Sequence, residues 1–266
     1  MDPIALSYGM GVDSTAVLVG WWRMGIRPHW IGHAQVGNEW PETYAYRPII
    51  DTWLANIGFP TITDVQYVVQ RPKHGSYSTL EENCLVNETL PSLAFGFKKC
   101  SLKWKGQPLD AACADYFSTH ISAGGRVQRA IGYDAGPCDS RRGGVETTGP
   151  WTWIYPLRAW GWDRDRCSLE IQRAGLPVPP KSACFYCPST KPDELIQLAR
   201  RHPDLARRAV VMEDRARPHL TKIQGLWGMG VKGTRGGKKR PGSWRVFLAE
   251  HAPEVLPENS PAGDLP

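Results

Sequence analysis

The sequence predicts an α/β fold, with a parallel twisted sheet that carries helices on both faces. Three short apolar segments are typical of buried strands: residues 4–7, 30–34 and 62–69. Two segments with helical spacing of apolar residues, 15–24 and 42–57, lie between them. A strand–helix–strand–helix–strand order makes successive strands parallel and places helices over both faces of the sheet.

The rest of the chain predicts one more strand and several helices. The strand is expected at residues 127–133, and the helices are expected at 109–121, 163–174, 192–201 and 203–217. A helical, cysteine-containing C-terminal part therefore follows the sheet. We expect a first domain over 1–190, a helical and basic region over 191–250, and a disordered tail rich in Pro over 251–266.

The net charge and the distribution of apolar residues indicate which partners and which location to expect. The chain has 266 residues and a formal net charge of +6, which favours a polyanionic partner such as a nucleotide or nucleic acid. No apolar run approaches the roughly 18 residues that span a bilayer, so no membrane partner is expected. The N-terminus lacks the pattern of a signal peptide. We therefore expect a cytoplasmic protein whose seven cysteines are thiols or metal ligands.

A glycine-rich turn joins the first strand to the first helix, where parallel sheets bind phosphate. Small residues let backbone N–H groups approach an anion, and the helix N-terminus adds favourable partial charge. The hydroxyls of Ser7, Ser14 and Thr15 are candidate donors. The alternative is an ordinary strand–turn–helix corner with Asp13 as its cap. The candidate cofactor-binding residues are Ser7, Tyr8, Gly9, Met10, Gly11, Val12, Asp13, Ser14 and Thr15.

The cysteines suggest a metal site. Cys184 and Cys187 have the C-x-x-C spacing with which two thiolates grip one metal, although this spacing also serves redox chemistry. Cys100 lies among lysines that would favour its thiolate. Cys113 and Cys167 fall within apolar helical patterns and are expected in the core. Cys138 lies in a glycine-rich loop and is either a surface thiol or a reactive one.

Several other polar residues are candidates, each with a structural alternative. The cationic candidates for phosphate contacts are Lys98, Lys99, Lys103, Lys105, Arg141 and Arg142. His33 ends the second strand, where it is either a ligand contact or a satisfied structural histidine. His74 is a candidate phosphate contact. The basic, glycine-rich stretch 232–245 is either a nucleic-acid contact or a solvated loop.

The segment Gly9-Met10-Gly11-Val12-Asp13-Ser14 resembles the pyrophosphate loop (PP-loop) of N-type ATP pyrophosphatases, which usually reads Ser-Gly-Gly-x-Asp-Ser. Gly9 and Met10 replace the leading Ser and first Gly, and Ser7 is the candidate to supply the missing hydroxyl. Further segments follow in the family's order: 38–44, Ile131-Gly132-Tyr133-Asp134 with Arg141-Arg142, and 155–163 with 175–177. Over residues 3–215 the chain is similar to the phosphoadenosine phosphosulfate (PAPS) reductase branch, with an adenine nucleotide alpha hydrolase-like fold.

This resemblance implies ATP and Mg²⁺ as cofactors, and cleavage between the α- and β-phosphates. Asp13, Ser14, Asp134, Arg141 and Arg142 are its implied catalytic residues. No cysteine follows Cys187, so the catalytic tail of assimilatory sulfonucleotide reductases has no counterpart. Adenylation of an acceptor for sulfur incorporation is therefore favoured, with DNA phosphorothioation preferred over tRNA thiolation and a cysteine desulfurase as sulfur donor. The alternatives are a sulfonucleotide (PAPS or APS) reductase and a non-catalytic nucleotide-binding module.

The resemblance also implies a [4Fe–4S] cluster, because it places the Cys100 segment beside the C-x-x-C pair. The candidate ligands are Cys100, Cys184 and Cys187, with Cys84 as the fourth. One alternative is a cluster on three cysteines whose open iron holds sulfide. The other alternative is a structural zinc.

Overall fold

The computed structural model describes residues 2–69, 77–140, 142, 144, 149–231 and 240–256. The chain forms two compact units, and each is described by itself. The first unit comprises Met1–Gln35, Glu39–Tyr67 and Lys105–Ala183. The second comprises Val36–Asn38, Val68–Trp104 and Cys184–Pro266. The predicted boundary at residue 190 differs from this division, in which two earlier segments join the second unit.

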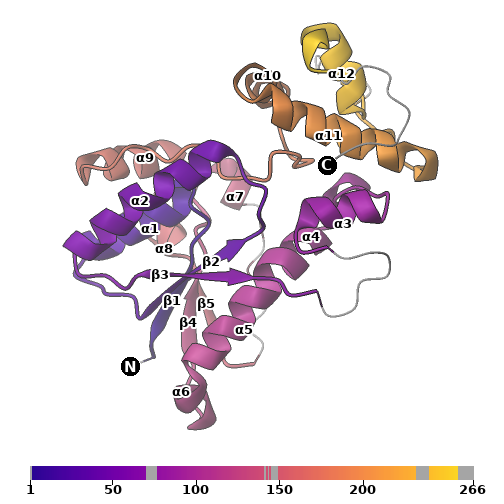
Figure 1. Ribbon diagram of the computed structural model, residues 1–266. Helices are drawn as coiled ribbons and strands as arrows, with labels where there is room; N and C mark the ends of the chain where they lie inside the picture. The colour runs from indigo at the N-terminus through magenta and orange to yellow at the C-terminus, as the bar shows by residue number, and fades with distance from the viewer. Residues whose placement is uncertain are drawn as a thin grey trace. The chain divides into compact units, whose positions relative to one another are not determined.

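The first unit is built on a parallel five-stranded sheet in the order β3-β2-β1-β4-β5 (Figure 1). The strands are β1 (Ile4–Ser7), β2 (Trp30–Gln35), β3 (Ile62–Gln66), β4 (Val127–Ala130) and β5 (Trp151–Ile154). The sheet confirms the predicted α/β class. The sequence predicts no strand at β5, which lies between a glycine-rich stretch and Pro156.

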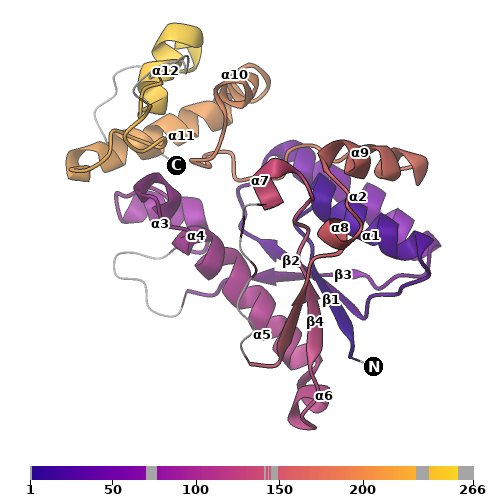
Figure 2. The same ribbon diagram turned by 180° about the vertical axis from the view of Figure 1, so that it is seen from behind.

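Helices cover both faces of this sheet (Figure 2). One face carries α1 (Val12–Arg23), α2 (Pro41–Asn56), α8 (Pro156–Ala159) and α9 (Arg164–Arg173). The other carries α5 (Gln107–Tyr116) and α6 (Ser118–Ser122), and α7 (Pro137–Ser140) follows β4. Asp163 caps α9 as predicted, since its carboxylate accepts the Arg166 N–H at 2.8 Å. None of the helices in the described residues has the length and apolarity that crossing a membrane requires.

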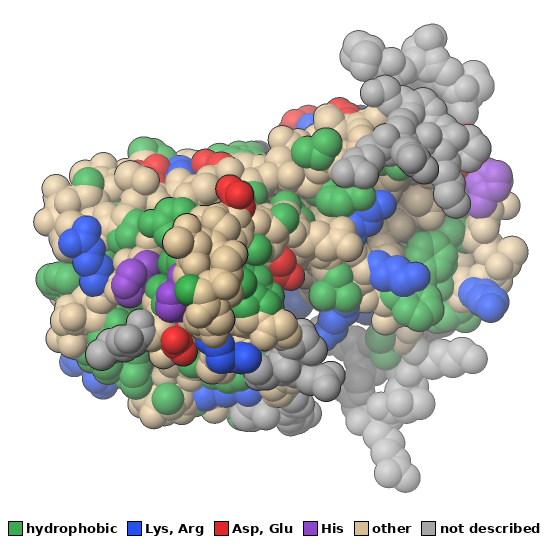
Figure 3. All heavy atoms as spheres, turned by 90° about the horizontal axis from the view of Figure 1, so that it is seen from below, with side chains coloured by type: hydrophobic (Ala, Val, Ile, Leu, Met, Phe, Trp, Pro, Cys, Tyr) green, Lys and Arg blue, Asp and Glu red, His purple; other side chains and the backbone are tan. Residues whose placement is uncertain are grey.

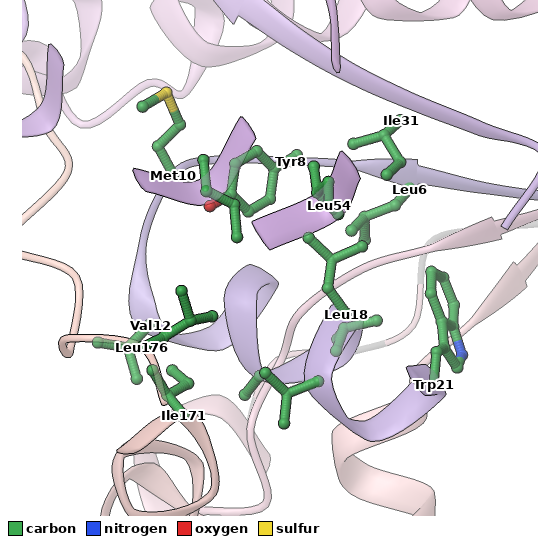
Figure 4. Packing of buried hydrophobic residues seen from close by; sticks show 14 of the residues in the cluster. Leu6, Tyr8, Met10, Val12, Leu18, Trp21, Ile31, Leu54, Ile171 and Leu176 are labelled. Atoms are coloured by element: carbon green, nitrogen blue, oxygen red, sulfur yellow. The ribbon is translucent and has the colours of Figure 1, made fainter. Parts of the chain in front are cut away.

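The period-two alternation of strand side chains separates the two cores. Leu6 and Ile31 point into the larger cluster under α1 and α2 (Figure 4), whereas Ala5 and Trp30 point into the smaller cluster under α5. Burying one such large side chain contributes roughly 1.5–3 kcal/mol. Helices packed on both faces therefore hold the sheet in place. They also fix the position of the carboxyl ends of its strands, where the glycine-rich turn begins.

The second unit is helical in its described part. Its elements are α3 (Leu80–Val86), η1 (Ser92–Phe95), α4 (Lys99–Ser101), α10 (Pro192–Arg201), α11 (Pro203–Ala216), η3 (Arg217–His219), α12 (Trp244–His251) and η4 (Pro253–Val255). The π-helical turn η2 (Leu102–Gly106) leads into α5. The prediction placed no helix at α3, although Thr79 and Glu82 form a reciprocal capping box there. The predicted tail starts at 251, whereas the structure continues through η4; residues 257–266 lie outside the described part.

A buried carboxylate organises the end of the second unit. Glu213 on α11 is fully buried and accepts the backbone N–H groups of Leu226 and Trp244 at 2.8 and 2.9 Å. It also accepts the Ser243 hydroxyl and the Arg245 N–H. Because the carboxylate satisfies four donors, it ties the 225–228 turn and the start of α12 to α11.

Candidate functional site

The glycine-rich turn leads directly into the first turn of α1. The helix begins at Val12, after Gly11 as N-cap, and no side chain caps it. The first N–H groups of a helix have no partner within the helix, and the helix dipole makes this end favourable for anions. Ser14 holds the turn in shape: its hydroxyl accepts the Gly9 N–H and donates to the Gly11 carbonyl, each at 3.2 Å.

Met10 adopts the backbone conformation that a glycine would favour at this place. Its φ is 56°, in the left-handed region, which costs a residue with a β-carbon roughly 1–2 kcal/mol. Its side chain is only 1% exposed and packs in the larger core cluster. Burial of the side chain thus offsets the backbone cost and keeps the turn shape despite the missing glycine.

Several predicted cofactor-binding residues turn their side chains away from the turn's open side. Tyr8, Met10, Val12 and Thr15 are buried in the core. The Thr15 hydroxyl lies 3.0 Å from the Tyr8 hydroxyl, and the Ser7 hydroxyl accepts a hydrogen bond from the buried Arg129 at 3.0 Å. Thr15 is fully buried, so its hydroxyl faces the core. The Ser7 hydroxyl acts as an acceptor for Arg129, and its own proton can still be donated.

Three carboxylates meet beside this turn. Oxygens of Asp13, Asp134 and Asp139 lie within 4.8 Å of one another, a spacing that can hold a metal ion. Asp13 is in the first turn of α1, Asp134 follows β4, and Asp139 lies on α7. Asp13 does not cap the helix, in contrast to the alternative considered for it. Asp139 was not singled out from the sequence, since only the fold brings its short helix to the other two.

Arginines surround these carboxylates. The Arg164 Nη1 lies 2.6 Å from Asp13 Oδ1, and the Arg142 Nε lies 3.0 Å from Asp139 Oδ1. Arg158 donates to the backbone carbonyls of Asp139 and Arg142. Arg142, a predicted candidate, thus lies beside the carboxylate cluster, and Arg158 and Arg164 were not among the candidates. Arg141 lies outside the described residues.

The electrostatics of the cluster favour a cation. Partial burial raises the pKa of Asp13 above its ordinary value, and repulsion from Asp134 and Asp139 adds to the shift. The ion pair with Arg164 opposes it but does not cancel it. An ionised Asp13 is therefore undercompensated in the protein alone, and a bound divalent cation would relieve this.

A second polar network contacts the glycine-rich turn through the Gly9 carbonyl. The Ser182 hydroxyl donates to the Gly9 carbonyl and contacts Glu39, whose carboxylate lies 2.6 Å from Lys105 Nζ. His33 is buried and its Nδ1 lies 3.0 Å from the Tyr8 carbonyl, so it has the satisfied structural role. Burial lowers the pKa of His33. Glu39 lies in segment 38–44, which the resemblance includes, but neither Glu39 nor Ser182 was singled out as a site residue.

The four candidate cysteine ligands all belong to the second unit. Cys84 lies on α3 and is buried, and Cys100 lies on α4 with its N–H bonded to Ser92 Oγ at 2.7 Å. Cys184 and Cys187 share one tight turn, closed by a 3.0 Å bond from the Cys187 N–H to the Cys184 carbonyl. Burial raises the pKa of the Cys84 thiol, and the nearby sulfurs of Cys100 and Cys184 raise it further.

The spacing of these thiols bears on the kind of metal. In the described part of the chain, the aspartate cluster is the only group of three or more candidate ligands within 4.8 Å. A single zinc with bonds of about 2.3 Å would need sulfurs about 3.8 Å apart. A cubane cluster offers each thiolate a separate iron and so holds them farther apart. Cys84 and Cys100 also line a cavity of about 270 Å³, together with Lys99, Lys103 and Trp104.

The remaining predicted residues fall in several places. Cys113 and Cys167 are fully buried core residues, as predicted. Lys98, Lys99 and Lys103 are exposed. His74, the Cys138 side chain and residues 232–239 lie outside the described part.

No protein-family model matches the chain, and a search of curated proteins finds no significant match.

Proposed function

We propose that this chain is an ATP pyrophosphatase with an adenine nucleotide alpha hydrolase-like fold. The observation that carries the proposal is the carboxylate cluster of Asp13, Asp134 and Asp139 beside the uncapped first turn of α1. The N-terminus of α1 suits an anion, and the three carboxylates suit a divalent cation. A metal-bound nucleoside triphosphate requires both. Arg142 and Arg164 add guanidinium groups at the same place.

In the proposed reaction an oxygen of the acceptor attacks the α-phosphorus of ATP. A phosphorus–oxygen bond to the acceptor forms as the bond to the α,β-bridging oxygen breaks, and pyrophosphate leaves with the bonding electrons. The N–H groups at the start of α1 would bind phosphate oxygens and orient the chain of phosphates. The three aspartates would hold Mg²⁺, which supplies neutralisation of the charge on the leaving group.

The cysteines of the second unit are proposed to hold a [4Fe–4S] cluster, and the acceptor is proposed to receive sulfur, with DNA phosphorothioation as the favoured case. The four cysteines belong to one unit, and a cubane cluster is held by three or four thiolates. The cavity beside Cys84 and Cys100 leaves space next to two of them.

Binding and cleavage can be tested separately. An ATP analogue with an α,β-methylene bridge should bind the protein in calorimetry only when Mg²⁺ is present. Asp139→Asn should weaken this binding by at least tenfold, because it removes a proposed metal ligand. Asp115→Asn, which alters an exposed carboxylate on α5, is the matched control and should bind normally.

Cleavage is measured as pyrophosphate release from ATP by anaerobically prepared protein, with single-stranded DNA, duplex DNA and tRNA supplied as acceptors. Release that Asp139→Asn abolishes supports the proposal. If the analogue bound equally well without Mg²⁺ and to the Asp139→Asn variant, the proposed site would be refuted. Release of sulfite from PAPS would identify a sulfonucleotide reductase instead.

A further inference from the structure

One segment of the second unit presents cations and large apolar side chains together at the surface. Residues 91–104 contain three lysines and no Asp or Glu. Within this run, Phe95, Phe97 and Leu102 expose 36, 60 and 66% of their surface. Single exposed apolar residues are ordinary, whereas three within eight positions concentrate apolar surface in one short segment. We call residues 95–103 the basic–aromatic segment.

The backbone holds this segment in a defined shape. Gly96 has a φ of 86°, and its N–H donates to the Leu93 carbonyl at 3.0 Å. The Phe97 N–H donates to the Ser92 carbonyl at 3.0 Å, and the Cys100 N–H donates to the Ser92 hydroxyl at 2.7 Å. The exposed side chains therefore extend from an ordered turn, and binding would not have to fix the backbone first.

The chemistry of the segment indicates its partner. Lys98 and Lys99 are exposed and form no ion pair with a carboxylate in the part of the chain that the structure describes. Figure 3 shows one face of the molecule, on which cationic side chains lie among hydrophobic ones. Phenyl rings beside the ammonium groups of Lys98 and Lys99 match a polyanion that carries flat rings.

We infer that the basic–aromatic segment binds single-stranded nucleic acid. Lys98, Lys99 and Lys103 would contact phosphates, and Phe97 would stack on a base. A single strand fits better than a duplex, since paired bases are already stacked on one another and cannot lie on a phenyl ring. A membrane fits less well, because the three-residue helix α4 is too short to lie along a bilayer with one apolar face.

The position of the segment also relates it to the thiols. Phe95, Lys99 and Lys103 line the same cavity of about 270 Å³ as Cys84 and Cys100. A bound strand would therefore pass next to these two thiols. The conclusion that this strand is the acceptor of sulfur rests on the proposed function, whereas the binding itself does not.

The test measures binding of a fluorescent single-stranded oligonucleotide by anisotropy, without ATP, over a series of salt concentrations. The double variant Lys98→Gln/Lys99→Gln should bind more weakly. Its slope of log affinity against log salt should fall by about 1.4, or about 0.7 for each lost phosphate contact. Lys222→Gln removes another exposed lysine of the second unit and should leave the slope unchanged.

Phe97→Ala should weaken binding by about 5-fold to 150-fold, the usual effect of losing one stacked base. Tyr116→Ala, at an aromatic residue that is 58% exposed on α5, should have no effect. Wild-type protein that binds no oligonucleotide, binds it equally well after all these changes, or prefers anionic vesicles would overturn the inference. Asp139→Asn should still bind the strand, so loss of ATP binding and loss of strand binding report on the two proposals separately.

Discussion

A β-carbon on Gly132 would lie 3.0 Å from the backbone nitrogen of Ser14 and 3.1 Å from the carbonyl carbon of Asp13. The chain after β4 thus touches the first turn of α1 directly, and only a glycine fits without displacement. Gly132→Ala should cost about 1–3 kcal/mol of stability by overpacking. Because the displaced atoms belong to the proposed phosphate site, the variant should also lose Mg²⁺-dependent binding of the methylene analogue in calorimetry.

Gly9→Ala is the matched control for this prediction. Its β-carbon would meet nothing closer than the Ser14 hydroxyl at 4.0 Å, so thermal unfolding should be nearly unchanged. If Gly132→Ala bound the analogue as tightly as wild type does, the contact between Gly132 and Ser14 would have no part in forming the site.

The carboxylate cluster predicts a conflict between stability and binding. The pKa of Asp13 is higher in the folded protein than in the unfolded chain. The protonated carboxyl therefore favours the folded state at low pH, and this stability is lost as the pH rises through the folded-state pKa. In the absence of divalent cations, Asp13→Asn should therefore melt at a higher temperature than wild type at pH 7. The difference should disappear in acid, below the ordinary pKa of an aspartate.

Magnesium should reverse this order of melting temperatures, so that wild type melts above Asp13→Asn. A ligand at a hundred times its Kd stabilises the folded state by about 2.7 kcal/mol, so Mg²⁺ should raise the melting temperature of wild type but not of Asp13→Asn. Asp115→Asn should follow wild type in both conditions. Equal responses of Asp13→Asn and wild type to Mg²⁺ would show that Asp13 is not a ligand.

The sequence predicted the sheet of the first unit well, since alternating and helical patterns are local. The first three strands and the helices α1, α2 and α9 lie within a few residues of their predicted places. The strand β5 was missed because it directly follows a glycine-rich stretch that is typical of a loop. The helix α3 lies in a polar stretch, and its start depends on a capping box of two side chains.

The site was predicted only where a motif marks it. Asp13 and Asp134 stand in segments with a family resemblance, and the structure places their carboxylates together. Asp139 and Arg164 join them through tertiary packing of α7 and α9, which no spacing along the chain reveals. Burial of Thr15 could not be predicted either, because a hydroxyl beside a glycine-rich turn faces the ligand or the core depending on where the helix begins.

The buried carboxylate of Glu213 makes the second unit sensitive to a change of one atom. Glu213→Gln replaces an acceptor oxygen with an NH₂ group that faces backbone donors. It should destabilise the protein by about 1–3 kcal/mol, because buried donors lose their partner. Urea unfolding measures this as a lower midpoint. Glu250→Gln, at an exposed position of α12, should leave the midpoint unchanged, and equal midpoints for both variants would contradict the role given to Glu213.

The proposed iron–sulfur site predicts a pattern across the cysteines. Anaerobically prepared wild-type protein should contain iron and sulfide and absorb visible light, whereas a zinc site would be colourless. Cys100→Ser and Cys184→Ser should each lose most of the iron, because a cluster needs three or four thiolates. Cys113→Ser and Cys167→Ser are the controls and should retain it, since both residues are buried in the first unit.

Cys84 decides how many protein ligands the cluster has. Its thiol is buried near the sulfurs of Cys100 and Cys184, and burial raises its pKa, so a thiolate at this place is stable only when a metal binds it. Loss of iron in Cys84→Ser would establish four cysteine ligands. Retention of iron, with loss of sulfur incorporation, would leave one iron open to hold sulfide. Wild-type protein that holds neither iron nor zinc would contradict the metal site altogether, and Cys184 and Cys187 would then be either a redox pair or ordinary packing residues.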